Sequence, residues 1–100
     1  MQAKTPEGIL ARRQNDLPFG ELAARFYRQA ETQNVLLEGS INPFLQKIIS
    51  KDAEDAEGMC LQIAKQNSKA FPDTLEDARQ RAAYVLAVAY RMGKERKILH

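Results

Sequence analysis

Few side chains in this 100-residue sequence are of the types that carry out catalysis. The chain has one cysteine, Cys60, and one histidine, His100, which is its last residue. A nucleophile needs a general base held close to it, and Cys60 falls on the apolar stripe of an expected helix. We therefore interpret Cys60 as a buried structural thiol, and we expect no enzyme activity and no cofactor.

An acidic segment, DAEDAEG at residues 52–58, has a composition similar to that of a calcium-binding loop. The calcium-loop pattern requires Asp or Asn at its fifth position, Gly at its sixth and Glu at its twelfth. Counted from Asp52, these positions hold Ala56, Glu57 and Ile63. Acidic residues also stabilise the first turn of a helix through the helix dipole. We interpret the segment as a helix start and expect no metal site.

Basic residues are the second group of candidate functional residues, because lysine and arginine bind phosphates. The candidates for contacts with nucleic acid are two arginine pairs and a C-terminal group, namely Arg12, Arg13, Arg25, Arg28, Lys94, Arg96 and Lys97. The alternative is that these residues lie on solvated faces, and that Arg91 and Lys94 complement the negative end of a helix. The 15 basic and 13 acidic residues leave a net charge of only +2, which favours the alternative.

Helices have to position these side chains, because helix-forming residues dominate and no segment alternates apolar and polar residues as a strand does. The spacing of apolar residues predicts four helices, at about 18–38, 43–50, 53–69 and 74–93. Residues 1–17 are expected to form either a short helix or a flexible arm.

Residues typical of helix ends mark the boundaries of these helices. Gly39 is expected to end the first helix in a left-handed conformation. Asn42 is expected to cap the start of the second helix. The last helix is expected to open with a capping box that begins at Asp73 or Thr74, and to end at Gly93.

Gly58 falls inside the expected 53–69 helix, where a glycine costs about 1 kcal/mol relative to alanine. The apolar stripe of that helix consists mostly of small residues. We therefore expect Gly58 to let a neighbouring helix pack closely.

The last helix is apolar on all sides, because all nine residues from 82 to 90 are apolar or aromatic. Such a helix is either central in the fold or buried against another chain. The 43–50 helix adds a dense apolar face, and a chain of this length has little protein with which to cover both. Apolar surface left over would mark an interaction site, and its candidate residues are Phe44, Leu45, Ile48, Ile49, Tyr84 and Val88. The alternative is a compact monomer in which both helices are buried.

The sequence therefore predicts an all-α fold, a compact bundle of four to five helices with the last helix central, in a single helical domain over residues 18–100. We expect a small non-enzymatic protein that binds another protein, as a regulator, inhibitor, adaptor or chaperone does, and that forms a homodimer through apolar helix surface. The alternative function is a nucleic-acid-binding module that uses the arginine pairs and the basic C-terminal tail.

The expected location is the cytoplasm. A single cysteine allows no intramolecular disulfide, and no apolar run reaches the ~18 residues that a membrane span needs. The N-terminal residues lack the apolar segment of a secretory signal. Nothing in the sequence indicates a small-molecule substrate.

Overall fold

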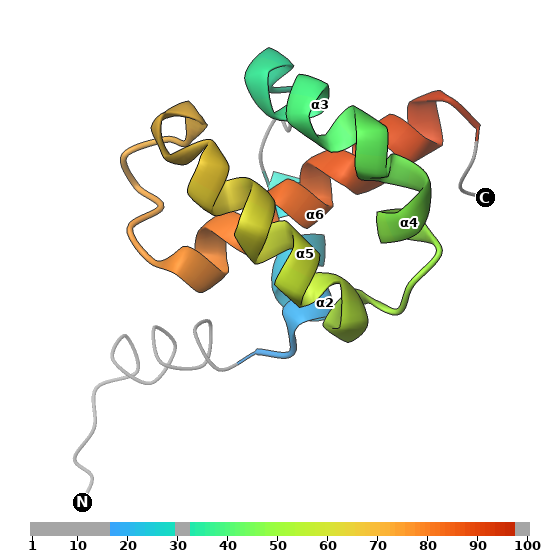
Figure 1. Cartoon of the computed structure of the whole chain (residues 1–100). Coiled ribbons are helices and arrows are strands. Elements are labelled where there is room, and N and C mark those ends of the chain that lie inside the picture. The colour runs from blue at the N-terminus through green and yellow to red at the C-terminus, as the bar shows by residue number, and fades with distance from the viewer. Residues whose placement is uncertain (1–16, 30–32, 98–100) are drawn as a thin grey trace, which may run out of the picture.

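The fold is built from helices around one long helix (Figure 1). The structure is a computed structural model, and it describes residues 17–29 and 33–97. The helices in chain order are α2 (Phe19–Gln29), α3 (Val35–Ile41), η1 (Asn42–Phe44), α4 (Leu45–Ile49), α5 (Ala53–Gln66), η2 (Ser68–Ala70) and α6 (Ala78–Glu95). These described ranges contain no strand. The prediction of an all-α bundle is confirmed, whereas the prediction for residues 1–17 lies almost wholly outside the described residues.

Helix α6 occupies the centre, as predicted. All eight residues from 82 to 89 are buried, and α6 packs against α2, α3, α4 and α5 (Figure 1). Tyr84 lies between two aromatic rings, with its centroid 6.0 Å from that of Phe26 and 5.8 Å from that of Phe71, both edge to face. A helix that is apolar on every side is stable in water only when other elements surround it, and here the chain supplies those elements itself.

The prediction of one helix over residues 18–38 is wrong. Helix α2 ends at Gln29, and α3 begins after Asn34, whose side-chain oxygen accepts a hydrogen bond from the Leu37 amide at 3.2 Å. Such a capping bond starts a new helix. An unbroken helix of that length would extend about 30 Å along one line. The break instead lets both α2 and α3 pack against α6.

Two predicted boundaries within this region also need correction. Gly39 does not end a helix, because it lies inside α3 and no described glycine has a positive φ. Asn42 does not cap a helix start, because its backbone is helical and the chain runs from α3 through η1 into α4 without a break. Both signals are local, whereas the burial of Leu37 and Ile41 against the core keeps this segment helical.

The last helix begins and ends later than predicted. Its cap is Asp77, whose carboxylate accepts a hydrogen bond from the Arg79 amide at 2.9 Å. The residues before it form a turn in which the Leu75 amide donates to the Pro72 carbonyl at 3.0 Å, and the Leu75 side chain is buried in the core. Gly93 is buried within α6, and the left-handed residue after the helix is Lys97, with φ at 60°.

The glycine that permits close helix packing is Gly20 and not Gly58. A Cβ added at Gly20 would lie 2.7 Å from the Cβ of Ala53, so α2 and α5 approach each other there. The Gly20 amide donates to Oε2 of Glu54 at 3.3 Å, which joins the starts of the two helices. A Cβ at Gly58 would have no atom within 4 Å. The structure therefore contains no packing reason for Gly58.

Among residues 17–29 and 33–97, no helix has both the length and the apolar character that crossing a membrane requires.

Candidate functional site

The apolar residues predicted to contact another chain lie mostly inside this one. Leu45, Ile48, Tyr84 and Val88 are buried in the core, and Ile49 is half-buried against it. Only Phe44 is exposed, at 41%. The predicted surplus of apolar surface is therefore covered within the chain, because α4 and α6 pack against each other. Of the six candidates, Phe44 alone is open to a partner.

Among the described residues, large apolar side chains are most exposed on α3. Val35 is 84% exposed and Leu36 is 68% exposed, whereas Leu37 and Ile41 on the opposite side of the same helix are buried. Gly39 is exposed on the outer side, and a Cβ there would meet nothing within 4 Å. We refer to Val35, Leu36 and Gly39 as the α3 surface. The charged residue of α3, Glu38, is half-buried and lies three residues after Val35.

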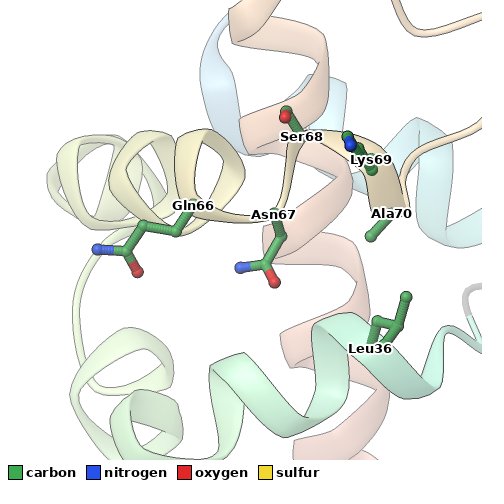
Figure 2. Close-up of a pocket in the computed structure, with 6 residues that line it drawn as sticks. All are labelled: Leu36, Gln66, Asn67, Ser68, Lys69 and Ala70. Atoms are coloured by element: carbon green, nitrogen blue, oxygen red, sulfur yellow. The ribbon is translucent and has the colours of Figure 1, made fainter.

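A hollow of about 330 Å³ adjoins the α3 surface. It lies between α3 and the segment formed by the end of α5 and η2 (Figure 2). Leu36 lies on its α3 side and Ala70 on its η2 side, and Asn67 projects into the space between them (Figure 2). Its six lining residues are Leu36, Gln66, Asn67, Ser68, Lys69 and Ala70.

Hydrogen bonds hold the two walls of the hollow in place. The Asn34 side-chain nitrogen donates to the Ala70 carbonyl at 2.8 Å, and the Ser40 hydroxyl donates to Oδ1 of Asn67 at 2.9 Å. Nδ2 of Asn67 in turn donates to the Ile63 carbonyl at 2.9 Å. All three bonds involve half-buried groups. Hydrogen bonds between such groups stabilise one relative position of α3, α5 and η2. The walls are therefore defined by directed contacts as well as by packing.

Cys60 is buried on α5, as predicted. Burial, together with a smaller contribution from the nearby charge of Glu57, raises the pKa of the Cys60 thiol to about 12. Burial also raises the pKa of Tyr90, with contributions from Cys60 and Glu54. A thiol acts as a nucleophile in its deprotonated form. This side chain is therefore held in its unreactive form at neutral pH.

The acidic segment at the start of α5 makes contacts with protein groups. Glu54 accepts the Gly20 amide, and Glu57 lies 3.5 Å from the Arg79 guanidinium. Within the part of the chain that the structure describes, no group of three or more potential metal ligands is present.

The basic candidates divide into three sets. Arg12 and Arg13 lie outside the described residues. Arg25 is half-buried and Arg28 exposed, both on α2. The C-terminal set, Lys94, Arg96 and Lys97, is exposed at the end of α6, where Nη1 of Arg96 donates to Oδ1 of Asn42 at 2.5 Å.

That hydrogen bond places two parts of the sequence together, residues 39–51 and residues 91–97. The first contains Lys47 and Lys51, both exposed and neither among the basic candidates predicted from the sequence. Their contribution to a positive surface could have been predicted, because residues 39–51 contain these two lysines and no acidic side chain.

Nothing in the sequence indicated that Val35 and Leu36 are exposed, because periodicity in a helix over 18–38 allowed either Leu36 or Leu37 on its apolar side. The hollow had no sequence signal, because its walls come from segments about 30 residues apart. Comparison of the chain with protein-family models, with curated proteins and with solved structures finds no match.

Proposed function

We propose that this chain is a non-enzymatic helical protein that acts by binding another protein through the α3 surface and the adjoining hollow. The observation that carries the proposal is the exposure of Val35 and Leu36 next to each other on α3. A large aliphatic side chain left in water forgoes about 1.5–3 kcal/mol of stabilisation that its burial would provide. A partner that covers both residues recovers that free energy.

The shape of the region supports the same proposal. Leu36 borders the hollow, so a partner side chain that enters it contacts Leu36 and Ala70 at once. Gly39 adds an open position beside Leu36, where a partner backbone can approach without meeting a side chain. The hydrogen bonds from Asn34 and Ser40 hold the walls before binding, which lowers the entropic cost of association.

The proposed partner is a different protein, because the residues expected to form a homodimer are mostly buried within one chain. The proposal also includes a cytoplasmic location, which a single cysteine favours.

Site-specific photo-crosslinking in the native host tests the proposal. A benzophenone amino acid replaces Leu36, and a matched variant carries it in place of Glu21, which is also exposed but lies on α2. We expect one discrete protein adduct from position 36 that position 21 does not form. Its loss when Val35 is also changed to Asp would confirm contact through the α3 surface. The same adducts from both positions, or none from either, would refute the proposal.

A further inference from the structure

The end of the molecule opposite the start of α6 concentrates positive charge. Residues 39–51 and 91–97 contain six basic residues and one acidic residue, whereas the whole chain has a net charge of only +2. The rest of the chain is therefore net negative. We refer to these two segments together as the basic end.

Tertiary structure brings the two segments together. Helix α4 packs against α6, and its Leu45 and Ile48 are buried in the core. Arg96 donates to Asn42 at 2.5 Å. Figure 1 shows η1 and α4 lying beside the last turns of α6. Charges that are about 50 residues apart in the sequence thus share one region of the surface.

Among the residues that the structure describes, one ion pair offsets part of the positive charge of the basic end. Its one acidic residue, Glu95, already lies 3.3 Å from the Arg91 guanidinium in an ion pair. Lys47, Lys94 and Lys97 are exposed, and none forms an ion pair with a residue that the structure describes. The Arg96 guanidinium has five N–H donors, of which one is directed at Asn42. These groups remain available to an anionic ligand.

An aromatic side chain lies within the same region. Phe44 is 41% exposed, two residues after Asn42 and three before Lys47. Proteins that bind single-stranded nucleic acid combine a positive surface for the phosphates with an aromatic ring on which a base stacks. A paired base inside a duplex cannot stack on such a ring without leaving its partner.

We propose that the basic end binds single-stranded nucleic acid. Lys47, Lys94, Arg96 and Lys97 contact backbone phosphates, and an unpaired base stacks on Phe44. This site is separate from the α3 surface, so a test of nucleic-acid binding is independent of the proposed protein partner.

Fluorescence anisotropy with the full chain and a labelled mixed-sequence 12-mer of single-stranded DNA tests this proposal. Four phosphate contacts to a single strand predict that affinity falls about 50-fold when salt rises fourfold. Reversing two charges with Lys94→Glu and Lys97→Glu should lower affinity about tenfold or more. Replacing Phe44 with leucine should lower it about fivefold, because stacking is lost while apolar packing is retained.

The matched control reverses two lysines outside the basic end, with Lys65→Glu and Lys69→Glu. Both residues are exposed, and the change in net charge is the same. We expect this variant to keep most of the affinity, and circular dichroism should show that all variants remain folded. Equal losses from both double reversals would overturn the proposal, as would no binding at low salt. Equal binding of the duplex or of anionic phosphatidylserine vesicles, with Phe44→Leu unaffected, would also overturn it.

Discussion

At the scale of single residues, two helical glycines lie in opposite environments. Gly20 faces Ala53 at a distance that leaves no room for a methyl group, whereas Gly58 faces open space. Both are glycines in amphipathic helices, and only the tertiary structure separates their roles.

The same substitution should therefore have opposite effects at these positions. Gly20→Ala should lower the free energy of unfolding by about 1–3 kcal/mol, because the helices must move apart. Gly58→Ala should raise it by about 1 kcal/mol through improved helix propensity. Urea denaturation of each variant measures both, and a loss of stability for Gly58→Ala would contradict the placement of Gly58.

The buried thiol of Cys60 should make the free energy of unfolding depend on pH. Its pKa is raised from 9.0 to about 12 in the folded chain, so the native state keeps the proton over a range in which the unfolded chain releases it. The resulting stabilisation is complete below pH 9 and is lost as pH rises toward 12. We expect Cys60→Ala to remove this dependence. The difference in stability between the native chain and the variant, followed by urea denaturation from pH 8 to pH 11, should therefore shrink with pH.

A thiol reagent provides an independent check of the same residue. Iodoacetamide at pH 8 should leave Cys60 unmodified in the folded chain and modify it in urea. Rapid modification without denaturant would contradict the burial of the thiol.

At the scale of elements, α3 and α6 differ in how many of their sides are covered. Helix α6 is surrounded, whereas α3 is covered only on the side of Leu37 and Ile41. Equivalent substitutions on the two helices should show this difference directly.

Replacing a valine with aspartate on each helix allows the comparison. Val88 has no exposed surface and Val35 is 84% exposed. Val88→Asp buries a carboxylate among apolar residues and should cost several kcal/mol, so that the chain fails to fold. Val35→Asp should change the free energy of unfolding by less than about 0.5 kcal/mol. Thermal melting followed by circular dichroism distinguishes the two, and similar effects would contradict the central position of α6.

Asn34 determines where α3 begins and also anchors it to η2. Asn34→Ala removes both the cap and the bond to Ala70, and should cost about 1–2 kcal/mol. Asn34→Asp keeps the capping oxygen but loses the donor to Ala70, so its cost should be smaller. Denaturation of the two variants separates the contributions, and equal costs would indicate that the cap adds little.

At the scale of the whole molecule, one chain covers its own core. The buried side chains of α2 to α6 form one cluster around α6, and the apolar face of α4 belongs to that cluster. The large apolar side chains that remain exposed in the described residues are Val35, Leu36 and Phe44.

Residues 17–29 and 33–97 leave three large apolar side chains exposed, whereas a stable homodimer interface buries about 800 Å² on each partner. We therefore expect sedimentation velocity to find a monomer up to the highest soluble concentration, in place of the homodimer that the sequence predicted. A concentration-dependent dimer would contradict this expectation. If Leu36→Asp abolished such a dimer, the partner of the α3 surface would be a second copy of the chain.

Much of the architecture could be predicted from short-range patterns. The nine apolar residues from 82 to 90 required a helix that is buried on all sides, either at the centre of the fold or against another chain, and the α5 and α4 regions followed from periodicity. Helix boundaries were less predictable, because Asn34, Gly39 and Asn42 are all residue types that favour helix ends. Asn34 does cap a helix, whereas packing keeps the backbone helical at Gly39 and Asn42. The candidate sites were the least predictable, since exposure at Leu36 depends on the elements that happen not to cover it.

The helical class and the burial of the last helix therefore follow from the amino-acid sequence alone, because a helix without a polar side has to be surrounded. Tertiary structure decided which apolar residues remain in water, which glycine lies at a helix contact, and which charges share a surface. Lys47 and Lys97 are 50 residues apart in the chain, and only the packing of α4 on α6 places their segments together. Periodicity describes one helix at a time, whereas a site depends on the contacts between helices.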